Sequence, residues 1–324
     1  MTKPRIGLVL GGGGPVGHAY HCGALRAIEE STGWDPRTAD VVVGTSAGAQ
    51  VAALLRAGMG AADLFARVTG GEMSADGAGI AHHYTRPEPA RGGSGRGWRP
   101  ASSQRLLRAL RRPWEAHPGT IVAALAPEGR TALAPMADGM REVFGDAWPA
   151  DATWFVALRL DTGQRVALGR AGAPHTDVGH AVTASCAVPG MFAPVEIEFS
   201  RYVDGGAVSP TNADLLEDEG LDLVLVLAPT SARTGAGVRP DTPVRHLMRA
   251  VLDSEVRKLA KAGIPAFVVQ PGRAELDAMG VNALDSGRME PVARAAREST
   301  VAVLSSPDEA GQLAALRTVA QSAQ

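Results

Sequence analysis

The chain has 324 residues, of which 45% are hydrophobic and 20% charged, a composition typical of a folded globular protein. Its formal net charge is −2 and no basic stripe runs along it, so a nucleic-acid partner is disfavoured. It has no run of about 18 apolar residues, so we expect no membrane span and a cytoplasmic location.

Predicted strands and helices alternate in the first part of the chain. In order they are the strand 6–10, the glycine loop 11–17, the helix 18–30, the strand 41–43 and the helix 47–57. We expect the first helix to end near Gly33, because glycine commonly terminates helices. Strands that alternate with helices favour a parallel sheet with helices packed against it.

The composition of the sequence changes over residues 70–150. Within that stretch, 82–100 is rich in Gly, Pro and Arg and is predicted to be an exposed loop that includes His82 and His83. The remaining predicted strands are 154–160, 164–168, 201–204, 221–227 and 266–270. The remaining predicted helices are 102–114, 135–144, 243–262, 290–304 and 308–320.

The cysteines and the first two histidines give no sign of a special site. Cys22 and Cys186 lie in apolar stretches, which favours buried thiols over a disulfide, and we expect Ser185 to pack near the site beside Cys186. His18 and His21 are three positions apart on a predicted helix, but no cysteine or acidic pair nearby completes a metal site.

The sequence Gly44-Thr45-Ser46-Ala47-Gly48 lies where the second predicted strand turns into a helix. A serine on such a tight turn is held in a strained conformation that exposes its hydroxyl, and Gly44 and Gly48 leave room for the turn. The following helix directs its N-terminal amides and positive dipole toward that hydroxyl. This pattern favours Ser46 as a nucleophile whose attack creates an oxyanion.

A glycine loop follows the first predicted strand, and its residues 12–17 fit the pattern G-x-G-x-x-G. That pattern alone would indicate a nucleotide-binding regulator using the Gly12–Gly17 loop, but no P-loop lysine follows it. The better explanation is an oxyanion hole, in which Gly12, Gly13 and Gly14 present bare backbone amides to the substrate. We expect the amide of Ala47 to complete it.

A serine nucleophile needs a base, and two candidates stand out. Asp204 ends a predicted strand in Tyr202-Val203-Asp204-Gly205-Gly206, where Gly205 and Gly206 free the backbone to turn. His246 follows in the order Ser, Asp, His that is usual for α/β-hydrolases. It lies inside a predicted helix, so Asp204 is the preferred base and His246 the alternative.

Four motifs together resemble the patatin-like phospholipases, with the strongest similarity at 5–57 and 182–216. They are GGGGPVGHAYHCGAL at 11–25, GTSAG at 44–48, ASCAVPGMFAPV at 184–195 and YVDGG at 202–206. The resemblance implies a three-layer α/β/α fold with a mostly parallel sheet. It also implies a Ser46–Asp204 dyad without histidine, and hydrolysis of fatty-acyl esters of lipids without a metal or cofactor.

The sequence departs from that family at one position of the glycine loop. Val16 stands where the family usually has Arg or Lys just before the last glycine, which leaves open a catalytically silent, lipid-binding member. Asn212 is our match for an asparagine that the family often carries soon after its Asp-Gly-Gly.

We expect one domain over 1–324, with about 70–150 as a variable lid or insert. Within it, Leu107, Leu110 and Trp114 share one face of a predicted helix, and Arg105, Arg108 and Arg112 share another. Such a cationic amphipathic helix can lie on an anionic membrane and would give the protein a peripheral membrane contact. An ordinary lid or surface helix fits the same pattern.

Overall fold

The computed structural model describes residues 3–84, 126, 129, 131, 133–306 and 313–322. The predicted loop beyond residue 84, the helix 102–114 and its amphipathic face lie outside the described residues. Within the described ranges, none of the helices combines the length and the apolar character needed to span a bilayer.

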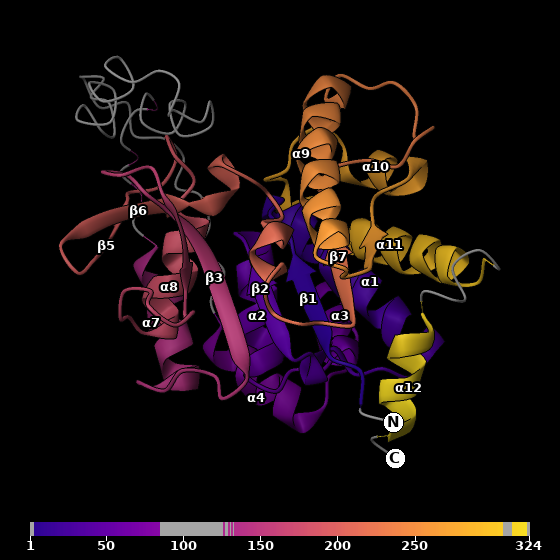
Figure 1. Cartoon of the computed structure of the whole chain (residues 1–324), viewed down its shortest axis with the longest axis horizontal. Helices are drawn as coiled ribbons and strands as arrows, with labels where there is room; N and C mark the ends of the chain where they lie inside the picture. Colours follow the sequence, from indigo (N-terminus) through magenta and orange to yellow (C-terminus); the bar gives the residue numbers. More distant parts are fainter. Residues whose placement is uncertain are drawn as a thin grey trace.

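The described strands form one mostly parallel sheet, in the order β5-β6-β3-β2-β1-β7-β8, with β4 paired to β3 (Figure 1). Strands β3, β2, β1, β7 and β8 are parallel, whereas β4 and β6 run antiparallel to β3. The strands are β1 Ile6–Leu10, β2 Val41–Gly44, β3 Ala152–Arg159, β4 Arg165–Leu168, β5 Val195–Ile197, β6 Ser200–Asp204, β7 Leu223–Leu227 and β8 Ala266–Val269.

Helices flank this sheet, which confirms the predicted α/β class. The α-helices are α1 Gly14–Thr32, α2 Ala47–Arg56, α3 Ala61–Thr69, α4 Ala75–His83, α7 Ala134–Phe144, α8 Val178–Cys186, α9 Thr242–Lys261, α10 Arg273–Met279, α11 Met289–Leu304 and α12 Ala314–Ser322. Short 3₁₀ turns lie at η1 Pro36–Thr38, η3 Gly205–Ala207, η4 Ala213–Leu216 and η5 Ser286–Arg288.

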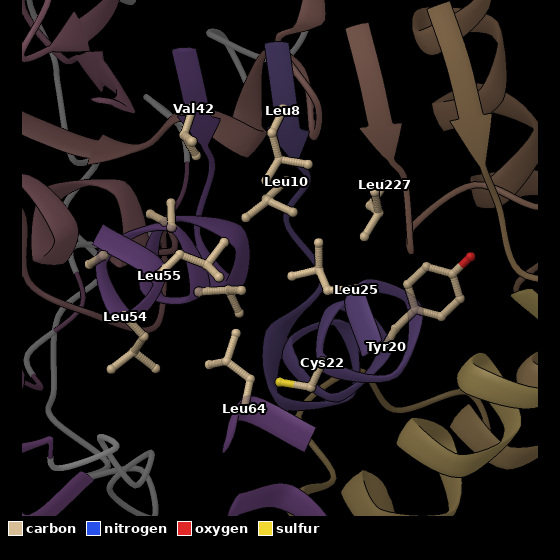
Figure 2. Packing of buried hydrophobic residues seen from close by; sticks show 14 of the residues in the cluster. Leu8, Leu10, Tyr20, Cys22, Leu25, Val42, Leu54, Leu55, Leu64 and Leu227 are labelled. Carbon is tan, nitrogen blue, oxygen red and sulfur yellow. The ribbon is translucent and has the colours of Figure 1, made fainter. Parts of the chain in front are cut away.

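Alternate side chains of the central strands enter two separate hydrophobic clusters, because successive residues of a strand point to opposite faces. Leu8 and Leu10 of β1 pack with the leucines of α1 and α2, as Figure 2 shows. Val9, between them, packs on the other face with Leu252 and Leu259 of α9. The central strands are therefore apolar on both faces, as their unbroken runs of Val and Leu predict.

Two predicted boundaries are wrong. The first helix begins at Gly14 rather than His18, since Pro15 stands in its first turn, where a missing N–H and a fixed φ favour helix formation. His82 and His83 are the last residues of α4 and do not lie in a loop. Nδ1 of His83 lies 2.8 Å from Oε2 of Glu142. This contact joins the C-terminal end of α4 to α7. The end of the first helix at Gly33, in the left-handed conformation, is confirmed.

Candidate active site

Ser46 follows Thr45 in the two-residue turn between the end of β2 and the start of α2, in a conformation that is strained for any residue but glycine. Its φ is 54° and its ψ is −118°. A Cβ on Gly44 would lie 2.6 Å from the Cα of Ala49, and one on Gly48 would lie 1.9 Å from the carbonyl oxygen of Leu10. Glycine is therefore the residue that fits at both positions around the serine.

Asp204 ends a strand, β6, that runs antiparallel to β2, the strand that leads to Ser46. Strand β3 pairs with β2 up to Phe155 opposite Gly44, and then continues past the end of β2. Strand β6 runs antiparallel to this extension and ends with Asp204 opposite Ala157. The carboxylate consequently arrives beside the turn that carries Ser46, and the Ser46 side chain lowers the pKa of the carboxylate.

The buried position of Asp204 changes its acidity. Burial raises its pKa to about 6, against hydrogen bonds from the Ser46 side chain and the Gly206 amide that lower it. The Gly206 N–H lies 2.7 Å from Oδ1 of Asp204, and a Cβ on Gly205 would lie 2.6 Å from the carbonyl oxygen of Val156. A carboxylate with a pKa near the working pH is well suited to accept and return a proton.

The glycine loop lies against Ser46, but its amides differ in what they can bind. The Gly12 N–H donates to the carbonyl oxygen of Pro210 at 2.8 Å, so it is already occupied, in contrast to our expectation for the oxyanion hole. Within the described part of the chain, the N–H groups of Gly13, Gly14 and Ala47 donate to no protein acceptor. The last two belong to the first residues of α1 and α2, where helix amides lack intrahelical partners.

His21 holds this loop from behind, a role that the sequence did not indicate. Its Nε2 lies 2.6 Å from the carbonyl oxygen of Gly11. Burial lowers the pKa of His21 to about 4, although that backbone hydrogen bond favours the charged form. The imidazole is therefore neutral at pH 7 and donates its Nε2 proton to the loop.

Ser185 and Cys186 of α8 lie beside the nucleophile, as expected, and Ser185 does more than pack. The Ser46 N–H donates to Oγ of Ser185 at 2.9 Å, and that hydroxyl donates to the carbonyl oxygen of Val156 at 2.7 Å. The thiol of Cys186 lies 3.3 Å from the Ser46 carbonyl oxygen, and burial raises its pKa, which keeps it protonated. Both cysteines are buried and neither forms a disulfide.

The pocket that contains Ser46 is mostly apolar. Among the described residues, His18 and Gln50 are the other polar side chains that line it. Most of the remaining wall is apolar and consists of Leu133, Met136, Val188, Phe192 and Leu284. Such a wall fits a hydrocarbon chain.

The structure also places His246, the alternative base, and Val16, the residue that departs from the family pattern. His246 is exposed on α9 and lines a different groove, together with residues of the loop 232–238. Val16 is buried in the first turn of α1, and its N–H donates to the carbonyl oxygen of Ala283 at 3.4 Å. Within the described ranges, no group of three or more His, Cys, Asp or Glu side chains is arranged to hold a metal ion.

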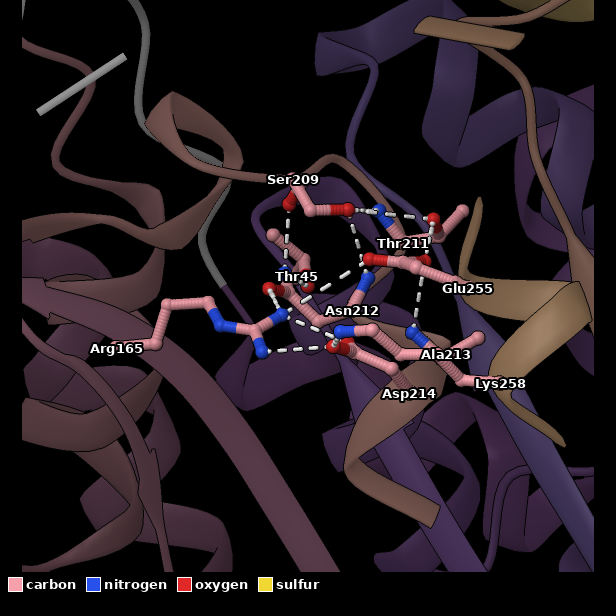
Figure 3. A network of polar contacts seen from close by, with 9 residues as sticks. All are labelled: Thr45, Arg165, Ser209, Thr211, Asn212, Ala213, Asp214, Glu255 and Lys258. Atoms are coloured by element: carbon pink, nitrogen blue, oxygen red, sulfur yellow. Dashed lines mark hydrogen bonds and ion pairs between the residues drawn. The ribbon is translucent and has the colours of Figure 1, made fainter. Parts of the chain in front are cut away.

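Asn212 is buried next to the turn that carries Ser46. Its Nδ2 donates to Oγ1 of Thr45 at 3.0 Å (Figure 3). The residue before the nucleophile is thus tied to the segment that follows the base.

Comparison with known proteins identifies the family of this chain. A family model described as patatin-like phospholipase matches residues 8–216. No curated protein matches the chain. Among solved structures, the crystal structure of VipD from Legionella pneumophila is similar, with a TM-score of 0.43 and 15% identity over 94% of this chain and 67% of that one.

Proposed function

This chain belongs to the patatin-like phospholipase family of lipid acyl hydrolases, and on that premise we propose that Ser46 and Asp204 are its catalytic dyad. One observation carries the proposal. A strained serine lies beside a buried carboxylate whose pKa its side chain lowers, next to backbone amides that have no protein acceptor among the described residues. The substrate is a fatty-acyl ester of a lipid, whose chain lies along the apolar wall of the pocket.

The reaction begins when Oγ of Ser46 attacks the ester carbonyl carbon while Asp204 takes the hydroxyl proton. The negative charge that develops on the carbonyl oxygen is stabilised by the free amides of Gly13, Gly14 and Ala47. The bond to the leaving alcohol then breaks and Asp204 gives the alcohol its proton. An acyl-serine remains.

Water completes the cycle. Asp204 takes a proton from water as the water oxygen attacks the acyl carbon, and the same amides hold the second oxyanion. The bond to Ser46 breaks, Asp204 returns the proton to the serine oxygen, and the fatty acid leaves. A neutral pH suits this cycle, because Asp204 must be ionised at the start of each half and its pKa is about 6.

Replacing either dyad residue tests the proposal. We expect Ser46→Ala and Asp204→Asn to lower the turnover of a 4-nitrophenyl acyl ester, since a positioned base alone contributes about 10²–10⁴-fold. Ser231→Ala is the matched control, because this buried hydroxyl bonds to the Ala228 carbonyl away from the site. Full activity in Ser46→Ala would contradict the assignment of the nucleophile, and full activity in Asp204→Asn would contradict the assignment of the base.

A fluorophosphonate probe separates the proposal from the lipid-binding alternative. The proposed hydrolase should be labelled at Ser46, because the probe needs an activated serine. A catalytically silent member would bind phospholipid vesicles and leave Ser46 unlabelled.

A further inference from the structure

Residues 209–214 contact all three loops that carry the proposed chemistry. The carbonyl oxygen of Pro210 accepts the Gly12 N–H of the glycine loop at 2.8 Å. The side chain of Asn212 donates to Thr45 of the nucleophile turn at 3.0 Å. The Ser209 N–H donates to the carbonyl oxygen of Gly205, next to the base, at 3.2 Å. One short segment therefore links nucleophile, base and glycine loop.

Two cations, the partly buried Arg165 and the half-exposed Lys258, fix this segment through the buried Asp214 (Figure 3). Arg165 of β4 donates to Oδ1 of Asn212 at 3.0 Å and to both oxygens of Asp214 at 2.7 and 2.9 Å. Lys258 donates to Asp214 at 2.6 Å. Burial alone would raise the pKa of Asp214, but the hydrogen bonds from Arg165 and Lys258 outweigh it and lower the pKa to about 2.

A second carboxylate, that of Glu255 in α9, forms hydrogen bonds with the middle of the segment. It accepts hydrogen bonds from Oγ1 of Thr211 at 2.6 Å and from the Ala213 N–H at 3.0 Å. Glu255 and Asp214 are only 4% and 6% exposed, so both carry a desolvation cost. Buried ion networks of this kind add little net stability compared with well-packed apolar residues, which points to a geometric role.

Backbone strain supports that role. Ser46 has a φ of 54° and a ψ of −118°, which is strained for a residue other than glycine, whereas Asn212 has a φ of 56° and a ψ of 31°, a left-handed conformation that asparagine tolerates. Strained residues persist where the surroundings determine their position several times over. Ser185 holds the Ser46 amide on one face of the sheet, and Asn212 holds Thr45 on the other.

We propose that residues 209–214 form a brace that sets the positions of the three catalytic loops relative to one another, with Asn212 as its positioning residue and Arg165 as its anchor. This inference rests on the proposed function of Ser46 and Asp204. The brace touches no substrate, so its effect is on the arrangement of the groups that do.

The test compares two arginines of the same hairpin. Arg165→Met removes the anchor, whereas Arg170→Met removes an ion pair with Glu219, at 2.8 Å, beyond the brace. Asn212→Ala removes the direct link to Thr45, and Arg165→Lys restores one cation at the anchor. The readouts are kcat and KM for a short-chain 4-nitrophenyl ester, the melting temperature, and hydrogen exchange at the amides of Gly12 and Ser46.

We expect Arg165→Met and Asn212→Ala to lower kcat by up to about 100-fold with KM nearly unchanged, because small displacements of catalytic groups cost that much. Both should speed exchange at Gly12 and Ser46, Arg165→Lys should recover part of kcat, and Arg170→Met should change neither kcat nor these amides. Equal kcat in Arg165→Met and Arg170→Met at equal melting temperatures, with unchanged exchange, would overturn the brace. If the wild type hydrolyses no ester while the exchange still responds, the brace stands and the proposed function fails.

Discussion

At Asp204, our proposed base, burial links the acidity of the side chain to the stability of the fold. Its carboxyl is buried, and burial raises its pKa from 3.8 to about 6. The folded protein therefore binds that proton more tightly than the unfolded chain does. The associated stabilisation is complete below pH 3.8 and is lost as the pH rises to about 6. His21 has the opposite sign, because its lowered pKa contributes stability that is lost as the pH falls from 6.5 toward 4.

Asp204→Asn removes the ionisable group, so the pH-dependent loss of stability should disappear in the variant that we also expect to have a lower ester turnover. The change of about two pKa units corresponds to roughly 3 kcal/mol of unfolding free energy. Relative to wild type, the variant should therefore gain stability between pH 4 and pH 7.5, as measured by urea unfolding at both values. Ser231→Ala, as the control, should differ from wild type by the same amount at both. A pH-independent difference for Asp204→Asn would mean that the carboxyl is not buried as described.

At the scale of elements, a glycine allows helix α1 to pack closely against helix α11. Helix α1 begins with the glycine loop, carries His21 and packs against α11. Gly23 lies at that contact, where an added Cβ would be 2.1 Å from the carbonyl oxygen of Ala293 and 3.0 Å from its neighbour Ala296. The two helices must separate to admit any side chain there.

Gly23→Ala should therefore destabilise the protein by about 1–3 kcal/mol, the usual cost of overpacking a tight contact. Gly79→Ala in α4 is the matched control, because an added Cβ there meets no atom within 4 Å. Alanine favours a helix over glycine by about 1 kcal/mol, so this variant should be neutral or slightly stabilised. The measurement is the midpoint of urea unfolding for each variant. Equal midpoints for Gly23→Ala and Gly79→Ala would contradict the close contact at Gly23.

Across the whole molecule, the pocket uses residues that lie outside the segment matched by the family model. That segment ends at residue 216, yet Leu284 lines the pocket that contains Ser46. The neighbouring Ala283 lies over the glycine loop, with its carbonyl oxygen 2.6 Å from where a Cβ of Gly14 would be. The C-terminal third of the chain thus supplies a wall that its family membership does not specify.

Changing Leu284 should shift the preference for acyl-chain length. Leu284→Trp fills the pocket and should lower kcat/KM for long-chain relative to short-chain 4-nitrophenyl esters, by roughly fourfold per methylene displaced. Leu284→Ala should shift the ratio the other way. Val281→Ala is the control on the same loop, because Val281 is 62% exposed and does not line the pocket. An unchanged length profile in both Leu284 variants would show that the chain does not reach this wall.

The sequence by itself determined most of the strands and helices and the family, and it singled out Ser46 and Asp204 as candidates. Local patterns are enough for this, because a buried strand, a glycine turn and an amphipathic helix each have a period or a residue requirement that spans a few positions. The family model over residues 8–216 confirms the resemblance. The roles of the two residues stay predictions until activity is measured.

Only the tertiary structure decided how these parts meet. The antiparallel course of β6 brings Asp204 to Ser46, and Pro210 occupies the Gly12 amide that the glycine pattern had offered to an oxyanion. The partners of Ser46 and Thr45, Ser185 and Asn212, lie 139 and 167 residues away along the chain. Contacts over such separations depend on strand order and direction, and no local period in a sequence records those.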